Sequence, residues 1–298
     1  MTKAASGWLN GLIAVAIFSG SMPATRAAVL DLDPVFVTVA RGAIAGVLAV
    51  AILAGFKSKR PSRAELKSLL ITTGGVVVGF PLLSALALRH VTSAHSLVFL
   101  GLLPLSTAVF AVLRGGERPQ LLFWIFSGLG SLCVAGFALS QGASASPLGD
   151  GLLFLAVIVC GLGYAEGARL SRTLGGWQVI SWALVIALPV MLPLSLLLLP
   201  SAGRPTAPAL LGLAYVSIFS MLIGFIFWYR GLSQGGIAAV GQLQLLQPFF
   251  GLALASLLLH ETVSSAMLLV TVAVIACVVG ARAFAHRRTP TATARPVA

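Results

Sequence analysis

The chain has 298 residues, of which 58% are hydrophobic and only 9% are charged, and its mean hydropathy is +1.04. A water-soluble globule of this length cannot hide so much apolar surface, so lipid is the expected solvent. The formal net charge of +12 does not indicate a nucleic-acid partner, because the basic residues lie between apolar runs and not on one polar face.

Ten apolar runs are long enough to cross a bilayer as helices. A helix needs about 20 apolar residues to span a hydrocarbon core of about 30 Å, and a chain in lipid must satisfy its own backbone hydrogen bonds. The unbroken runs favour helices over the alternating strands of a barrel, so we expect an all-α integral membrane protein. The runs are residues 8–28, 34–56, 66–88, 93–113, 121–141, 148–169, 177–199, 208–229, 237–259 and 264–284.

The distribution of Lys and Arg predicts how these segments are oriented, because cytoplasmic loops retain positive charge. A cytoplasmic N-terminus leaves only Arg26, Arg89 and Arg204 on the opposite side, with Arg41 inside a segment. We therefore expect both termini in the cytoplasm and the protein in the inner (plasma) membrane. The stretch 287–298, rich in Thr, Pro, Ala and Arg, is expected to be a disordered basic tail near anionic lipid headgroups.

The second half of the chain repeats the first. A displacement of 144 residues superimposes three pairs of identical residues: Pro104 on Pro248, Glu117 on Glu261, and Gly136 on Gly280. Because each repeat holds an odd number of helices, the second copy must enter the membrane from the opposite side. We predict two inverted five-helix halves, residues 1–141 and 142–286, with a small-molecule substrate held near the midplane between them.

The two halves resemble the EamA-type branch of the drug/metabolite transporter (DMT) superfamily. The resemblance rests on the five-helix units, the Pro-to-Glu spacing, and the stretches ALRHVTSAHSLVFLGLLPL and GLSQGGIAAVGQLQLLQPF. It covers about residues 8–285, and the pattern is most similar to YddG-type amino-acid exporters. The resemblance implies alternating access and a central cavity lined by the first, third, fourth, sixth, eighth and ninth helices, with the fifth and tenth as supports.

Two prolines stand about eleven residues into the fourth and ninth runs, near the bilayer centre. Proline lacks an N–H and clashes with the carbonyl four residues earlier, so Pro104 and Pro248 should bend their helices and free the carbonyls of Leu100 and Gln244. These carbonyls could hold a substrate ammonium group, or the prolines could serve as hinges. A kink that only improves packing is the alternative.

Three glutamines on the ninth run should face protein or water, because lipid penalises each amide. Gln244 and Gln247 share a helix face, whereas Gln242 points nearly opposite. We expect the pair to contact the substrate. Hydrogen bonding between helices is the alternative.

Aromatic residues and one histidine complete the expected substrate site. Phe80, Phe99, Tyr164 and Trp228 lie on segments expected to line the cavity, where their rings could form an amphipathic wall or bind a cation. Ordinary packing is the alternative, or interfacial anchoring for Trp228. His95, near the outer start of the fourth run, could sense pH or meet the substrate.

Charged residues within the segments are few. Arg41 could attract a carboxylate, but it lies about seven residues past Pro34, and we expect its side chain to snorkel to the outer interface. The acids lie in loops or near helix ends, Glu166 included, which favours facilitated efflux over carboxylate-driven antiport. Glu117 and Glu261 are expected to stabilise the N-terminal ends of the helices that follow them.

An integral-membrane enzyme is the alternative from another class, but the sequence offers no catalytic residues. The stretch HETVS at 260–264 lacks the second histidine of a zinc-protease helix, and neither a G-x-S-x-G turn nor a phosphate-binding loop is present. The cysteines lie singly inside apolar runs, so no disulfide framework, metal site or cofactor is expected. A neutral, amide-bearing interior favours an amino acid or similar metabolite over a cationic drug or a nucleotide sugar. The sequence leaves the oligomeric state open, with a monomer as one option.

Overall fold

The computed structural model describes residues 2–56, 58, 60–91, 93–140, 146–200, 205–251 and 265–285, and the regular structure in these ranges is entirely helical. The first half contains α1 (Lys3–Ser19), α2 (Ser21–Asp31), α3 (Pro34–Gly55), α4 (Arg63–Thr72), η1 (Thr73–Gly79), α5 (Phe80–Ala87), α6 (Ser93–Leu100), α7 (Leu103–Gly115) and α8 (Leu121–Ser140). The second half contains α9 (Pro147–Leu174), α10 (Gly176–Leu197), α11 (Ala207–Tyr215), η2 (Val216–Ile223), α12 (Gly224–Gly235), α13 (Ile237–Gly241), η3 (Gln242–Leu246) and α15 (Ser265–Phe284).

Consecutive elements join into rods that we number as helices 1 to 10. Helix 1 is α1 with α2, helix 2 is α3, helix 3 is α4 with η1 and α5, helix 4 is α6 with α7, and helix 5 is α8. Helices 6 and 7 are α9 and α10, helix 8 is α11 with η2 and α12, helix 9 begins with α13 and η3, and helix 10 is α15. Each predicted segment falls on one rod, although the end of the ninth lies outside the described residues, as does the tail 287–298. Six rods of 22 to 29 residues are long and apolar enough to span a bilayer.

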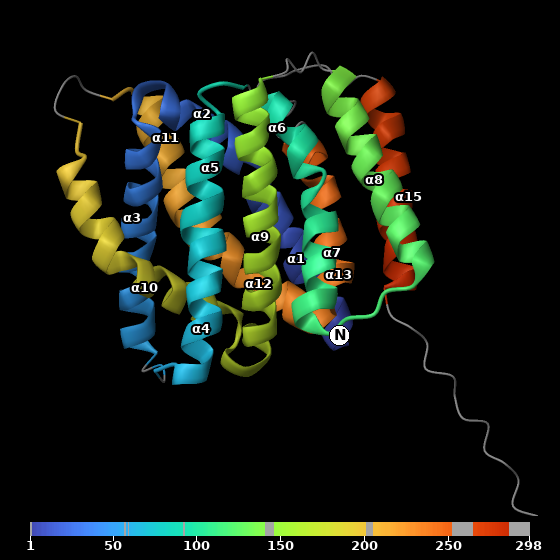
Figure 1. Ribbon diagram of the computed structural model, residues 1–298, viewed down its shortest axis with the longest axis horizontal. Coiled ribbons are helices and arrows are strands. Elements are labelled where there is room, and N and C mark those ends of the chain that lie inside the picture. The colour runs from blue at the N-terminus through green and yellow to red at the C-terminus, as the bar shows by residue number, and fades with distance from the viewer. Residues whose placement is uncertain are drawn as a thin grey trace, which may run out of the picture.

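The two halves are inverted, as predicted. Figure 1 shows α1 starting at the end of the bundle marked N, whereas its counterpart α9 runs toward that end. We call this the inner end, because the basic loops that the sequence predicts to be cytoplasmic also lie there. The helix contacts obey the same twofold relation: helix 1 packs on helix 8 as helix 6 packs on helix 3, and helices 2 and 7, 4 and 9, and 5 and 10 pair with each other.

These contacts divide the central helices into two bundles. Each bundle contains helices from both halves of the chain. Bundle A consists of helices 3, 4 and 6, and bundle B of helices 1, 8 and 9. The pair α3 and α10 flanks one side and the pair α8 and α15 the other (Figure 1). The position of α8 and α15 at the side of the molecule, away from its centre, agrees with the supporting role that the resemblance implies for helices 5 and 10.

Each central bundle contains one wide helical turn, at positions related by the repeat. The N–H of Phe80 in helix 3 bonds to the carbonyl of Gly75, and the N–H of Gly224 in helix 8 bonds to that of Phe219, each five residues back. All four positions correspond under the displacement of 144 residues. Such π-helical turns occur frequently at functional sites, and these two flank the centre of the molecule.

Glycines let the helices within each bundle approach closely. A Cβ at Gly75 of helix 3 would lie 2.4 Å from the carbonyl oxygen of Val159 in helix 6. In the same way, a Cβ at Gly231 of helix 8 would lie 2.8 Å from the backbone nitrogen of Gly11 in helix 1. Small residues at helix contacts are the usual means of tight association in lipid. Each bundle is therefore a closely packed unit.

Candidate functional site

A small cavity lies where the two bundles face each other. Its walls come from helices 1, 3, 4, 6, 8 and 9, with one residue from helix 2. Five predicted site residues line it: Phe80, Leu100, Tyr164, Gln244 and Gln247. The cavity volume is about 30 Å³, which is room for a few water molecules at most, so the bundles must separate before a larger solute can enter.

Helices 4 and 9 give the cavity two unlike walls. Leu100 and Leu103 on helix 4 correspond, under the displacement of 144 residues, to Gln244 and Gln247 on helix 9, and all four line the cavity. The Gln244 amide nitrogen donates to the Tyr164 hydroxyl at 3.2 Å, across the boundary between the bundles. The Gln244 side-chain oxygen is buried and has no hydrogen-bond partner. It is an acceptor available to a bound solute.

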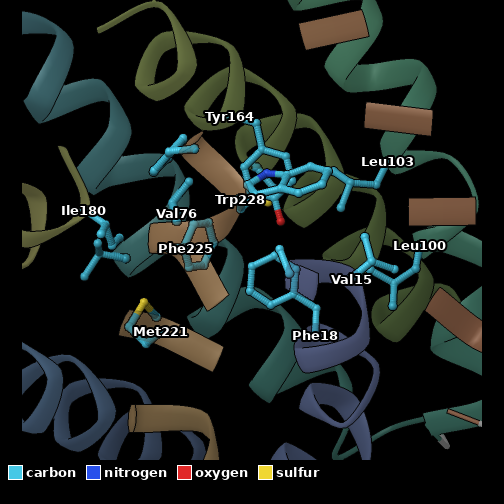
Figure 2. Close-up of a cluster of buried hydrophobic side chains, with 14 of the residues drawn as sticks. Val15, Phe18, Val76, Leu100, Leu103, Tyr164, Ile180, Met221, Phe225 and Trp228 are labelled. Atoms are coloured by element: carbon cyan, nitrogen blue, oxygen red, sulfur yellow. The ribbon is translucent and has the colours of Figure 1, made fainter. Parts of the chain in front are cut away.

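Aromatic rings close the cavity toward the inner end. Tyr164 and Trp228 pack edge to face with their centroids 5.3 Å apart, and the rings of Phe18 and Phe225 are 5.0 Å apart (Figure 2). One turn further along helix 8, the Tyr229 hydroxyl donates to the carbonyl of Gly163 in helix 6 at 3.2 Å. This layer joins bundles A and B directly below the cavity.

The residue from helix 2 that lines the cavity is Arg41. Its side chain is only 5% exposed, and its Nε has no hydrogen-bond partner. The expectation that it snorkels to the outer interface is therefore wrong. Neighbouring helices enclose the guanidinium and direct it inward, although it lies only about 10 Å along the helix from Pro34.

An ion cluster at the inner end holds bundle A together. The fully buried carboxylate of Glu166 on helix 6 pairs with Arg114 of helix 4 and, at 2.8 Å, with Arg169 one turn along its own helix. Arg169 also donates to the Ser68 hydroxyl of helix 3 at 2.8 Å. Glu166 lies near the inner end, as expected, but it is committed to these two arginines and does not reach the cavity lining.

A second carboxylate joins the two bundles at the inner end. Glu117 accepts hydrogen bonds from the backbone N–H groups of Ile237 and Ala238 at 2.7 and 2.8 Å, and Arg172 lies 3.4 Å away. It therefore caps helix 9, and the expectation that it stabilises the helix that follows it, α8, is wrong. Its counterpart, Glu261, lies outside the described residues.

The outer end has a different tie between the bundles. The guanidinium of Arg26 on helix 1 donates to the carbonyl of Leu88, which follows helix 3. One donor thus links bundle B to bundle A above the cavity, and Glu117 links them below it. The described residues thus bridge the two bundles on both sides of the cavity.

Comparison with known proteins identifies the family. A family model described as the EamA-like transporter family matches residues 5–139 and again residues 147–282. The chain belongs to the EamA-like transporter family. The resemblance to the EamA-type branch of the DMT superfamily is thus confirmed, and the chain is a multi-pass membrane transporter.

Two further comparisons give a related transporter and a protein with the same fold. The chain is 66% identical over 286 residues to "Uncharacterized transporter YdeK" of Bacillus subtilis (strain 168), an alignment that covers 96% of this chain and 100% of that protein. A protein of known crystal structure shares the fold, with a TM-score of 0.77, at 18% identity over 94% of this chain and 98% of the other.

Three predicted residues of this EamA-type chain lie outside the cavity lining. His95 is buried in bundle A, where its Nε2 lies 2.6 Å from Oδ1 of Asp150 and ties the outer ends of helices 4 and 6. The ring of Phe99 packs 5.8 Å from that of His95. Trp228 is fully buried behind Tyr164, so interfacial anchoring is excluded for it.

The predicted hinges of the EamA-type chain lie at irregular turns. Helix 4 is interrupted between Leu100, where α6 ends, and Leu103, where α7 begins one residue before Pro104. Helix 9 instead tightens into η3, and the N–H of Gln247 bonds to the main-chain carbonyl of Gln244. The predicted free carbonyl at Gln244 is therefore wrong, because the tighter turn supplies a donor three residues on.

Proposed function

We propose that this EamA-type chain is an exporter of amino acids or similar small metabolites across the inner (plasma) membrane, working by alternating access. The observation that carries the proposal is the composition of the cavity between the bundles: two amides and several rings, with no Asp or Glu among the described residues that line it. Such a lining suits a solute with a polar head and an apolar side chain.

Ties between the bundles at the two ends of the molecule support alternating access. Glu117 bridges bundle A to bundle B at the inner end, and Arg26 bridges them at the outer end. Release of one tie while the other holds would open the cavity to one side only. The irregular stretches next to Pro104 and Pro248 are the proposed hinges, because helices bend most readily where the α-helical hydrogen-bond pattern is disturbed.

We propose that the solute moves down its own concentration gradient, without coupling to protons. A proton-coupled carrier usually keeps an ionisable acid where substrate and proton compete. Glu166, the fully buried acid of bundle A, is paired with two arginines away from the cavity. A multidrug carrier for cationic amphiphiles would also need an acid to attract its cargo, so that alternative lacks support in the lining.

Solute flux in proteoliposomes tests this proposal. Purified protein is reconstituted, and entrance counterflow is measured for a panel of radiolabelled L-amino acids and for quaternary amines, with and without a pH gradient. We expect saturable counterflow of at least one amino acid that does not require the gradient. Flux of quaternary amines alone would favour the multidrug alternative, and flux seen only with a pH gradient would refute facilitated transport.

A further inference from the structure

Arg41 is a buried charge without a partner in the part of the chain that the structure describes. Its side chain is 5% exposed, it lines the cavity, and none of the hydrogen bonds or ion pairs among the described residues includes it. Burying a guanidinium without compensation is costly in a membrane protein, where such residues normally pair or serve function.

The acids in the described part of the chain are committed elsewhere. The sequence has seven Asp and Glu residues, and six lie in the described ranges. Glu166, Glu117 and Asp150 bind the partners given above, and Asp31 accepts from Thr206 near the outer end. The remaining two cap the starts of helices: Asp33 caps α3 and Glu65 caps α4.

We propose that Arg41 binds the carboxylate of the transported solute, an inference that rests on the proposed transport function. A guanidinium presents paired N–H donors that match the two oxygens of a carboxylate. The unpartnered side-chain oxygen of Gln244 lines the same cavity and can accept a hydrogen bond from an ammonium or amide group. The apolar part of the solute would then contact Phe18, Phe80 and Phe225, which line the remaining wall.

This assignment narrows the class of substrate. A cavity whose described lining holds one buried cation and no carboxylate repels quaternary amines and cationic amphiphiles. It favours free amino acids, or related molecules that combine a carboxylate with a hydrogen-bond donor, over their amides and their decarboxylated amines.

The test compares matched solutes with matched variants. For each amino acid that the reconstituted wild type transports, inhibition of its counterflow is measured with the same amino acid, with its carboxamide and with its decarboxylated amine. We expect the wild type to prefer the free carboxylate by about tenfold or more, the ratio that loss of one charge-assisted hydrogen bond produces. Arg41→Met should reduce that preference to about one, and Arg41→Lys should retain part of it.

Stability of the ligand-free variants supplies an independent readout. If Arg41 has no structural partner, Arg41→Met removes a buried unpaired charge and the melting temperature in detergent should stay equal or rise. A lowered melting temperature together with an unchanged carboxylate preference would overturn the inference. Arg63→Met, which removes an exposed charge at the start of α4, is the matched control and should change neither quantity.

Two further outcomes separate this inference from its premise. If the wild type transports no solute in the panel, the proposed function fails, and the melting temperature of Arg41→Met still decides whether Arg41 is unpaired. If chloride, compared with gluconate, stabilises the wild type but not Arg41→Met while the carboxylate preference is absent, Arg41 holds an inorganic anion and the inference fails.

Discussion

Neutralising Glu117 should shift the transporter toward a conformation open at its inner end. Glu117 lies on the connection between helices 4 and 5 and holds the start of helix 9 through Ile237 and Ala238. Glu117→Gln keeps the size of the side chain and one acceptor oxygen. It therefore retains one of the two backbone hydrogen bonds and loses the other, together with the negative charge.

The size of the effect follows from these contacts. A hydrogen bond to a charged group contributes about 1.5–3 kcal/mol, and a carboxylate at a helix N-terminus contributes about 0.3–1 kcal/mol more. The Glu117 side chain is only 11% exposed, so solvent screens these interactions weakly. A loss of about 2 kcal/mol changes the ratio of open to closed conformers about 30-fold. An inner-open state populated at about 1% would rise to about one quarter of the molecules.

Distances between spin labels at the inner ends of the two bundles measure this shift. Thr173 at the end of helix 6 and Ser233 at the end of helix 8 are suitable label sites, because each hydroxyl bonds to a carbonyl of its own helix. The native cysteines are replaced first. We expect one short distance in the wild type and an added longer component in Glu117→Gln.

A matched variant separates this effect from a general loss of charge. Glu65 also caps a helix, but it caps its own α4 through a reciprocal arrangement with Ser62 and does not bridge the bundles. Glu65→Gln should leave the distance distribution unchanged. If Glu117→Gln shows no longer component, or if Glu65→Gln shows the same one, Glu117 does not hold the inner end closed.

Three other substitutions test the cavity wall and the packing. Gln244→Leu should lower kcat/KM for the transported solute about tenfold through loss of about 1.5 kcal/mol of hydrogen bonding; unchanged flux in proteoliposomes would contradict this. Gln242→Leu should raise the melting temperature, because both amide atoms of this buried side chain lack partners; a decrease would show that the amide is satisfied. Gly75→Ala should destabilise the protein by about 1–3 kcal/mol through overpacking against Val159, whereas Gly74→Ala, which has open space, should be tolerated in the same thermal assay.

The ten segments and the inversion could be predicted because both depend on local properties of the sequence. Hydrophobic length determines which runs cross the membrane, and an odd number of helices in each repeat determines the inversion. The exchange of helices that forms bundles A and B could not be predicted in the same way. It depends on which helix faces approach each other, and close contacts such as that between Gly75 and helix 6 leave no mark in hydropathy.

The candidate site could be predicted only in part, because some of its residues are marked by local sequence properties and others are placed by contacts between helices. Gln244 and Gln247 stand out as amides in an apolar run, and the repeat draws attention to the matching position of Leu100. The place of Arg41 in the cavity could not be predicted from its position along helix 2, because the neighbours that enclose its side chain come from other helices. The role of Glu117 was missed because its backbone donors lie 120 and 121 residues further along the chain.

The contrast between the leucines of helix 4 and the glutamines of helix 9 should fix the orientation of the bound solute. A symmetric dimer of identical five-helix units would present the same chemistry on both sides of its axis, and a bound molecule could lie either way round. In this chain the corresponding positions hold Leu100 and Gln244, so the two sides of the cavity differ. A solute should therefore keep a single orientation throughout the cycle, with its hydrogen-bond donor against Gln244 of helix 9 whichever side of the membrane it leaves.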